Sequence, residues 1–260
     1  MKTKIKAFLK NGYLVDIYRA FKHARLQTKL DRLFKADRYH FYASAAATEK
    51  RFDDEAIFEL AFKNDKTVTT PIEPHYTYHP AWAARVLAQT KPEKHIDISS
   101  TLNFCTLVSA FVPIDFYDYR PADIHLNGLA CKKGDLTNLP FESDTIKSLS
   151  CMHTIEHIGL GRYGDPIDYD GDLKAIAELK RVLSVGGDLL IVTPIGKPKI
   201  EFNAHRIYSY QQILNYFSPL KLVEFSLVPD AFENVVLIKD APQELANEQI
   251  WGCGCFWFKK

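Results

Sequence analysis

Short apolar runs alternate with helix-length stretches from residue 94 onward, and this alternation constrains the fold more than any other feature of the sequence. Helices are expected at Leu102–Phe111, Asp172–Leu183 and Tyr208–Phe217. Strands are expected at His95–Ser99, Pro113–Tyr119, Gly128–Lys132, Thr145–His153, Asp188–Thr193, Leu220–Val228, Asn234–Lys239 and Ile250–Lys259. Strands that alternate with helices along a chain form a parallel sheet with helices on its faces.

The last two of these strands have no predicted helix between them. Strands joined without a crossover helix pair antiparallel, so the C-terminal strands should form an antiparallel edge of the sheet. Hydrophobic residues make up 47% of the chain, which is enough to build a packed core. We therefore expect an α/β fold with a mostly parallel sheet and an antiparallel C-terminal edge.

The first 79 residues predict a different structure. Apolar residues recur at steps of three and four over residues 1–65, with Lys and Arg between them, which indicates an amphipathic helical region. Pro71, Pro74 and Pro80 predict an irregular link over residues 66–80 and a helix over residues 81–91 that starts after Pro80. We therefore divide the chain into a basic helical extension with its linker, residues 1–79, and an α/β domain, residues 80–260.

Positive charge is concentrated at the N-terminal end. Residues 1–40 hold eleven Lys and Arg and three Asp, a net charge of +8 against +1 for the whole chain. Such a segment contacts phosphate, anionic lipid or an acidic partner, or it is a solvated helix face. The remaining residues carry a net charge of −7, which argues against a nucleic-acid partner because nucleic acid binds basic grooves. The sequence predicts no oligomeric state.

Two features favour a cytoplasmic protein, with peripheral membrane contact through residues 1–40 as one option. No apolar run reaches the ~20 residues that cross a bilayer, and Lys10, Asn11 and Gly12 interrupt the first apolar stretch before a signal-peptide core forms. The cysteines form no Cys-x-x-Cys pair, which indicates free buried thiols; they are Cys105, Cys131, Cys151, Cys253 and Cys255.

Polar side chains follow the predicted strands at their carboxyl ends, where open α/β sheets bind ligands. Asp118 lies ~20 residues beyond the first strand's turn, a spacing that suits a carboxylate accepting from two ribose hydroxyls. Asp135 is a candidate acceptor for an adenine amine, with Leu136 against the ring, and the first turn offers backbone N–H groups to an anion. The full set of candidate cofactor residues is Asp97, Ser99, Ser100, Asp118, Tyr119, Asp135, Leu136 and His153.

Two segments resemble the class I S-adenosylmethionine-dependent methyltransferases. Residues 134–157 read GDLTNLPFESDTIKSLSCMHTIEH. They are similar to the section of that family in which an acidic residue is followed by Leu-Pro-Phe, a strand and Glu-His. Residues 175–194 read AIAELKRVLSVGGDLLIVTP, which resembles the family's helix and strand on either side of Gly-Gly. Residues 156–165, EHIGLGRYGD, with NAHR at 203–206, resemble an uncharacterised branch of the family. The resemblance implies a Rossmann-like sheet of seven strands and S-adenosyl-L-methionine as cofactor.

The turn after the first strand departs from that family. The family has glycine two positions after the acidic residue, where this chain has Ser99. Glycine permits positive φ and lets the backbone approach the methionine part of the cofactor, whereas serine resists positive φ at a cost of ~1 kcal/mol. Because serine is small, we expect the cofactor site to be retained.

Methyl transfer to oxygen or nitrogen needs an acceptor held in line and a base that takes its proton. Histidine has a suitable pKa for this role, so His157 and His205 are the candidate catalytic bases. The candidate substrate-binding residues are Glu156, Arg162, Tyr163, Asp165 and Arg206. By analogy with neighbouring families, the expected acceptor is a small molecule or glycan, such as a surface-polysaccharide precursor.

Three alternatives compete with this interpretation. His153 to His157 fits the H-x-x-E-H zinc motif, which needs both histidines on one helix face; because His153 ends a predicted strand, we expect no metal site. Residues 164–172 hold four Asp but lack the order of a calcium loop, so a solvated loop with Asp172 as a helix cap is expected. A non-catalytic module that docks a partner or membrane through its basic N-terminus is favoured by Ser99.

Overall fold

The computed structural model describes residues 13–46, 60–230 and 235–260. The chain divides into two compact units, Met1–Pro71 and Ile72–Lys260. The predicted helical residues 1–12 and 47–59 lie outside the described part of the chain. Within the described ranges, no helix combines the length and the apolar character needed to span a membrane.

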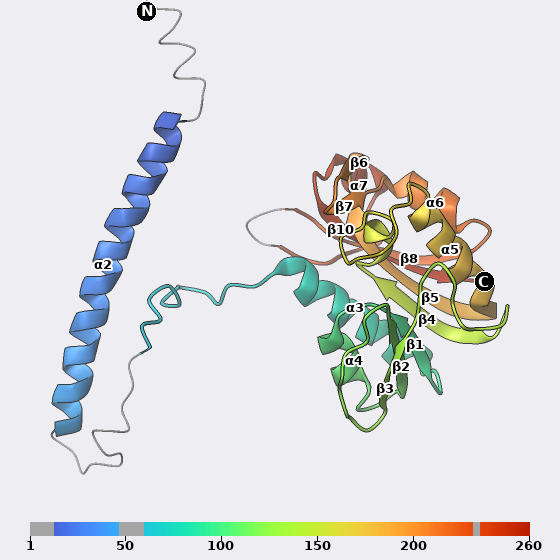
Figure 1. The fold of residues 1–260 in the computed structure, drawn as a ribbon, viewed down its shortest axis with the longest axis horizontal. Coiled ribbons are helices and arrows are strands. Elements are labelled where there is room, and N and C mark those ends of the chain that lie inside the picture. The colour runs from blue at the N-terminus through green and yellow to red at the C-terminus, as the bar shows by residue number, and fades with distance from the viewer. Residues whose placement is uncertain (1–12, 47–59, 231–234) are drawn as a thin grey trace, which may run out of the picture. The chain divides into compact units, whose positions relative to one another are not determined.

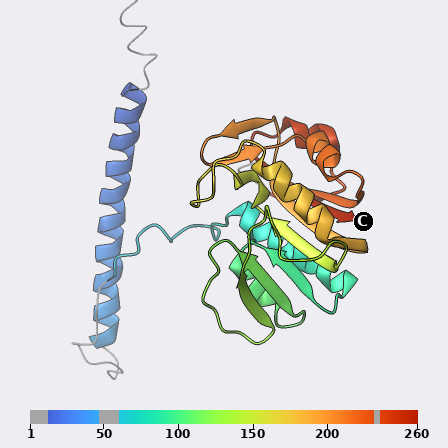
Figure 2. The same cartoon turned by 45° about the vertical axis from the view of Figure 1, so that its right-hand side comes forward.

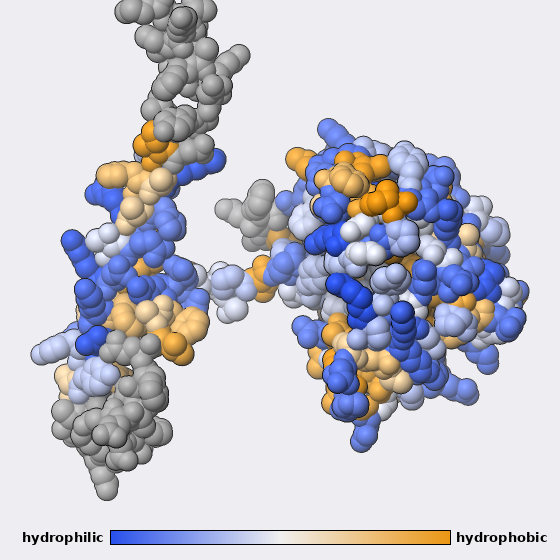
Figure 3. Space-filling view, viewed as in Figure 1, coloured by the Kyte–Doolittle hydropathy of each residue, from blue (hydrophilic) through white to orange (hydrophobic). Residues whose placement is uncertain are grey.

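The first unit contains α2 (Tyr13–Ala46), a helix of 34 residues. Its apolar side chains are spread around the helix axis, so the prediction of a single apolar face was wrong; Figure 3 shows apolar and hydrophilic residues interspersed on it. Residues 60–65 were predicted to be helical but form no helix. Lys63 of this segment forms an ion pair with Asp31 of α2.

The second unit opens with α3 (Pro74–Thr90), which begins earlier than the prolines predicted. The Glu73 side chain caps the helix by accepting from the N–H of Tyr76 at 2.5 Å, and Pro74 occupies a first-turn position, where its missing N–H costs nothing. Pro80 lies inside the helix. The prediction of an irregular link was therefore wrong for residues 74–80, and the predicted domain boundary at residue 80 falls within α3.

The second unit is built on an eight-stranded sheet in the order β3-β2-β1-β4-β5-β10-β8-β9. β1 to β5 run parallel, and β10, β8 and β9 add to β5 antiparallel. This confirms the predicted sheet type, with eight strands instead of seven. The bounds are β1 (His95–Ile98), β2 (Ile114–Asp118), β3 (Leu129–Lys133), β4 (Ile146–Met152), β5 (Leu183–Ile195), β8 (Lys221–Val228), β9 (Ile238–Lys239) and β10 (Gly252–Lys259).

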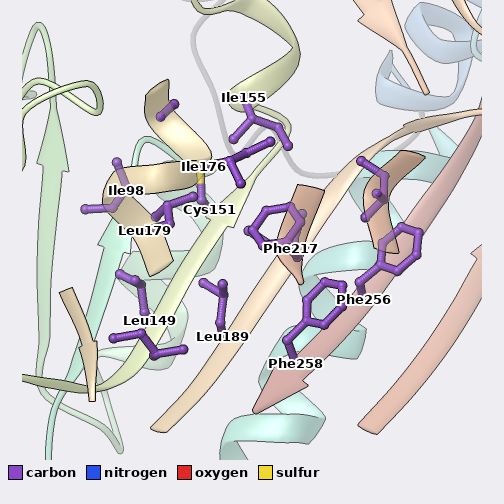
Figure 4. Packing of buried hydrophobic residues seen from close by; sticks show 14 of the residues in the cluster. Ile98, Leu149, Cys151, Ile155, Ile176, Leu179, Leu189, Phe217, Phe256 and Phe258 are labelled. Atoms are coloured by element: carbon purple, nitrogen blue, oxygen red, sulfur yellow. The ribbon is translucent and has the colours of Figure 1, made fainter. Parts of the chain in front are cut away.

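Helices cover both faces of this sheet (Figures 1 and 2). α3 and α4 (Leu102–Val108) pack on one face through a buried cluster that includes Trp82 and Phe104. α5 (Gly171–Val182) and α6 (Tyr210–Phe217) pack on the other. Because both faces are covered, the strands are apolar on both sides. Figure 4 shows part of the buried cluster on the face covered by α5 and α6, including Leu149, Ile176, Leu179, Phe217, Phe256 and Phe258.

Several elements outside the parallel strands differ from the predictions. Asp170, not Asp172, occupies the N-cap position of α5. α7 (Gln243–Glu248) lies between the last two strands, where no helix was predicted. An antiparallel hairpin of β6 (Lys199–Glu201) and β7 (His205–Ile207) was also missed, because each strand has only three residues.

Candidate active site

A cavity of about 500 Å³ lies at the carboxyl ends of β1 to β4. This is the edge of the sheet at which the sequence predicted a ligand site. Nine of the predicted site residues line it: Ser99, Asp118, Tyr119, Asp135, Leu136, His153, His157, Tyr163 and Asp165. The other predicted residues do not line it: Asp97, Ser100, Glu156, Arg162, His205 and Arg206.

The turn after β1 places Ser99 at φ +57°, in the left-handed region that glycine occupies without strain. The backbone N–H and the hydroxyl of Ser99 both donate to the carbonyl of Tyr117, at 2.8 and 3.1 Å. Thr154 donates through its hydroxyl to the carbonyl of Ser99 at 3.0 Å. The serine therefore takes the backbone path expected of glycine, and neighbouring hydrogen bonds hold it there.

Asp97 and Ser100 lie behind this turn and support it. The Asp97 carboxylate accepts from the N–H of Ser100 at 3.0 Å and from the hydroxyl of Ser150 on β4. The hydroxyl oxygen of Ser100 in turn accepts from the N–H of Met152 at 3.0 Å. Burial raises the pKa of Asp97 to about 6, although the hydrogen bonds from Ser150 and Ser100 act in the opposite direction. Both residues position the turn instead of facing the cavity.

Asp118 and Asp135 present carboxylates at the ends of β2 and β3. Asp118 accepts from the N–H of Arg120 at 2.7 Å. Asp135 accepts from the N–H and the hydroxyl of Thr137 at 2.8 and 2.7 Å, and both bonds use Oδ1. These local turns fix the carboxylates and leave hydrogen-bonding capacity for a ligand. Leu136 is buried beside them and adds an apolar surface to the cavity.

His153 follows β4 directly and, like Ser99, has a positive φ, +54°. Its Nδ1 lies 2.9 Å from Oε1 of Glu156, which is fully enclosed. Burial opposes the ionisation of Glu156, but the hydrogen bond and charge of His153 hold its pKa below the ordinary value. Glu156 therefore orients His153, and its placement does not support the predicted contact with substrate.

His157 and His205, the two predicted bases, have different environments. His157 lines the cavity, and its Nδ1 lies 2.6 Å from the carbonyl of Ala204. Because a carbonyl only accepts, Nδ1 carries the proton and Nε2 of the neutral ring can accept one. His205 lies outside the cavity, with Nε2 at 3.0 Å from Glu201 but without hydrogen-bond geometry, and burial lowers its pKa. Only His157 is placed to act as a base.

The segment EHIGLGRYGD forms a loop organised by Asp165. The Asp165 carboxylate accepts from the N–H groups of Gly159, Gly161 and Tyr163 at 2.8 to 3.3 Å. Gly159 has φ +82°, and a Cβ there would lie 2.0 Å from the carbonyl oxygen of Asp168. Asp165 lines the cavity, but its carboxylate binds the backbone of the loop, which gives a structural reason for Gly159 and Asp165 in this segment.

Arg206 anchors the same loop from the side away from the cavity lining. The buried guanidinium donates to the carbonyls of Ile158 at 2.7 Å and Tyr169 at 3.0 Å. Its Nε lies 3.5 Å from Asp172, which also accepts from the hydroxyl of Tyr208 at 2.8 Å. The prediction that Arg206 binds substrate is therefore not supported, because its donors are used by the protein. The prediction that Asp172 caps α5 was also wrong, because Asp170 occupies the N-cap position and the Asp172 carboxylate accepts from Tyr208.

Tyr163 lies at the cavity between two arginines. The guanidinium carbons of Arg120 and Arg162 lie 4.9 and 5.1 Å from its ring centroid. Arg162 itself is exposed and donates to the carbonyl of Ala204 at 3.1 Å. Sequence reasoning did not select Arg120, Thr154 and Lys174, which also line the cavity.

The zinc-hydrolase alternative does not agree with the backbone around His153. Only Ile155–His157 forms a helical turn, of the 3₁₀ type, and His153 precedes it in a left-handed conformation. The two histidines therefore do not share one face of an α-helix, as the motif requires. Their Nδ1 atoms also have different partners, Glu156 and the carbonyl of Ala204.

Comparison with known proteins shows a similar overall fold. A family model described as "Caenorhabditis protein of unknown function, DUF268" matches residues 136–226, which include the EHIGLGRYGD segment. The N-methyltransferase NodS from Bradyrhizobium japonicum WM9, solved with S-adenosyl-L-homocysteine, superposes with a TM-score of 0.51 at 10% identity, over 77% of this chain and 91% of NodS. The 1,6-didemethyltoxoflavin-N1-methyltransferase of Burkholderia thailandensis gives 0.49 at 9% identity, over 71% of this chain and 80% of that one. No curated protein sequence matches the chain.

Proposed function

We propose that the second unit, which has the Rossmann-like fold of class I methyltransferases, binds S-adenosyl-L-methionine and methylates a small polar acceptor. The observation that supports this most directly is the cavity at the carboxyl ends of β1 to β4, where the Ser99 turn, Asp118, Asp135 and Leu136 meet. Its volume of about 500 Å³ is typical of small-molecule sites.

The residues around the cavity fit this cofactor. Asp118 would accept from the ribose hydroxyls, and Asp135 would accept from the adenine amine through the oxygen that Thr137 does not use. Leu136 would pack against the adenine ring. Ser99, held at positive φ, keeps the backbone path that lets N–H groups of the turn approach the methionine part. When bound, the cofactor supplies a methyl group carried on a positively charged sulfur.

His157 is the proposed base. Its Nδ1–H is engaged by the carbonyl of Ala204, so Nε2 would take the proton that an acceptor hydroxyl or amine loses. A hydrogen bond of this kind fixes both the tautomer and the orientation of the imidazole. His205 has no such role, because it does not line the cavity.

The acceptor side of the cavity carries Tyr163, Arg120 and Lys174. An aromatic ring beside cations suits a polar or anionic acceptor, since it offers both an apolar face and hydrogen-bond donors. We therefore propose a small acceptor, with carbohydrate-like compounds such as surface-polysaccharide precursors as the class to screen first.

Calorimetric titration of the full chain with S-adenosyl-L-homocysteine tests the cofactor site. We expect micromolar binding by the wild-type protein and a loss of at least about 30-fold in Asp118→Ala, the equivalent of ~2 kcal/mol. Asp123→Ala is the matched control, because Asp123 lies on the connection after β2 but is almost fully exposed and outside the cavity.

Absence of binding at millimolar ligand by the folded wild-type protein would contradict the proposed enzyme. The alternative, a non-catalytic module that docks a partner or an anionic membrane through residues 1–40, would then be tested by co-sedimentation of the full chain with vesicles containing phosphatidylserine. Equal loss of binding in Asp118→Ala and Asp123→Ala would instead show that Asp118 does not contact the ligand.

A further inference from the structure

A cluster of imidazoles and a thiol lies where α3 meets the ends of β4 and β10. One nitrogen each of His75 and His153 and the Sγ of Cys253 all lie within 4.8 Å of one another. His75 and Cys253 are buried, and the side chain of His153 is nearly so. These three residues come from positions far apart in the sequence, and the packing of α3 against the sheet brings them together.

Two nitrogens near this cluster lack hydrogen-bond partners. Nδ1 of His75 and Nε2 of His79 are buried and unpaired. The Nδ1 of His79 lies 2.7 Å from the carbonyl of His75, so it carries the proton and the unpaired Nε2 presents a lone pair. Buried polar atoms without partners are uncommon and costly. A ligand that accepts a lone pair, such as a metal ion, can satisfy an unpaired imidazole nitrogen of this kind, as can a water molecule that donates to it.

The orientation of His153 also fits such a ligand. Its Nδ1 is held at 2.9 Å from the Glu156 carboxylate, and its Nε2 lies 3.5 Å from the Sγ of Cys253. A carboxylate on the far nitrogen is the usual support of a metal-bound histidine. Zinc bonds of ~2.0 Å to nitrogen and ~2.3 Å to sulfur at the tetrahedral angle separate the two ligand atoms by about 3.5 Å. The observed separation agrees with that value.

We propose that His75, His153 and Cys253 bind a zinc-type transition metal ion, with Glu156 orienting His153. Two imidazoles and a thiolate are ligands that Zn²⁺ prefers and that Mg²⁺ and Ca²⁺ do not. This assignment departs from the sequence-based expectation of no metal site. It does not depend on the proposed methyltransferase activity, because the ligands lie beside the cofactor residues and only His153 lines the cavity.

A catalytic thiol is the competing explanation for a Cys253–His153–Glu156 arrangement. Cys253 has no exposed surface, so a substrate could not reach its sulfur. A simple thiol–imidazole hydrogen bond would also account for the 3.5 Å separation. It would leave the unpaired nitrogen of His75 unexplained.

Titration of the purified, chelator-treated full chain with Co²⁺ tests the site directly. We expect one equivalent of Co²⁺ per chain, a near-ultraviolet thiolate-to-cobalt band, intense visible bands of tetrahedral Co²⁺, and displacement by Zn²⁺. Cys253→Ala should abolish the thiolate band. His75→Phe, which keeps an aromatic ring beside Trp251, should weaken binding at least about tenfold, and Glu156→Gln should weaken it about 10- to 100-fold.

Cys255→Ala is the matched control, because Cys255 lies on the same strand and is equally buried but does not belong to the cluster. It should keep the complete spectrum. Failure of the folded wild-type protein to take up stoichiometric Co²⁺ or Zn²⁺, or a thiolate band that survives in Cys253→Ala, would overturn the assignment. The wild-type spectrum decides the question even if a variant does not fold. S-adenosyl-L-homocysteine binding is measured separately, so the two proposals can fail independently.

Discussion

The two halves of the cavity wall use charged residues in different ways. At the ends of β2 and β3, Asp118 and Asp135 are bound only to nearby backbone groups or Thr137 and retain capacity for a ligand. In the loop that leads from η2 (Ile155–His157) to α5, Asp165 accepts from backbone N–H groups of the loop, and Arg206 on β7 donates to carbonyls of the same loop. A charged residue in a distinctive motif is thus a ligand contact only where the fold leaves its polar atoms available.

Removal of Arg206 should give the largest effect. Arg206→Leu leaves Asp172 without its buried cation and removes the donor to the carbonyls of Ile158 and Tyr169. Breaking a buried ion pair in this way typically costs ~3–5 kcal/mol, and we expect a loss of that size in the free energy of unfolding, measured by urea denaturation. Arg162→Leu is the control and should change it by less than ~1 kcal/mol, because Arg162 is exposed. Equal effects of the two variants would show that the buried contacts of Arg206 do not hold this loop.

A second prediction asks whether the β1–β4 half also depends on buried polar groups. His95 lies between the hydroxyls of Ser148 and Ser150, both at 2.7 Å, and burial lowers its pKa to about 3. A depressed histidine pKa gives stability that is present above about pH 6.5 and lost as the pH falls toward the folded pKa. From pH 7 to pH 5 this corresponds to ~2 kcal/mol. Between pH 7 and pH 5, the free energy of unfolding of His95→Gln should therefore fall by ~2 kcal/mol less than that of the wild type.

Asp97 acts in the opposite direction in the same range. Burial raises the pKa of Asp97 to about 6. The contribution of Asp97 to stability is therefore present when the pH lies below the ordinary pKa of an aspartate, and it is lost as the pH rises through about 6. Because Asp97 is present in both proteins, urea denaturation of wild type and His95→Gln at pH 7 and pH 5 measures the contribution of the histidine together with any change that its loss transmits to Asp97 through Ser150. Identical pH dependence in the two proteins would show that His95 does not remain neutral in the folded state.

Asp135 provides a smaller test of the ligand-facing half. If Asp135 accepts from the adenine amine, Asp135→Asn should weaken S-adenosyl-L-homocysteine binding about five- to tenfold, the loss of one hydrogen bond to a carboxylate. Calorimetric titration measures this. Asp165→Asn is the matched comparison, because Asp165 also lines the cavity but its carboxylate binds the backbone of its own loop. This variant should lose less affinity for S-adenosyl-L-homocysteine than Asp135→Asn. A larger loss of affinity in Asp165→Asn than in Asp135→Asn would indicate that adenine binds on the loop side of the cavity.

Ser99 should give the smallest effect. Ser99→Gly relieves the cost of a left-handed residue, ~1–2 kcal/mol, but removes the bond to the carbonyl of Tyr117 and adds chain entropy to the unfolded state. We expect a net gain of ~0.5 kcal/mol in the free energy of unfolding and no loss of cofactor affinity. A clear destabilisation would mean that the hydroxyl, more than the backbone path, maintains this turn.

The sequence predicted the parallel part of the sheet, and it predicted that Asp118 and Asp135 follow strand ends, where both line the cavity. Strand ends follow from where apolar runs stop, so the positions of Asp118 and Asp135 follow from local pattern. The roles of Arg206 and Asp172 could not be predicted, because their partners are carbonyls and a hydroxyl on other elements. The His75–Cys253 pair has no sequence signal at all, since only the docking of α3 on the sheet brings it together.

His153 belongs both to the cavity wall and to the cluster with His75 and Cys253. If both proposed sites bind their ligands, this shared imidazole can link them thermodynamically. If an ion at the cluster changes the affinity of the cavity for its ligand by some factor, the ligand must change the affinity for the ion by the same factor. Each site can therefore be used to report on occupancy of the other, and the position of His153 sets the strength of that linkage.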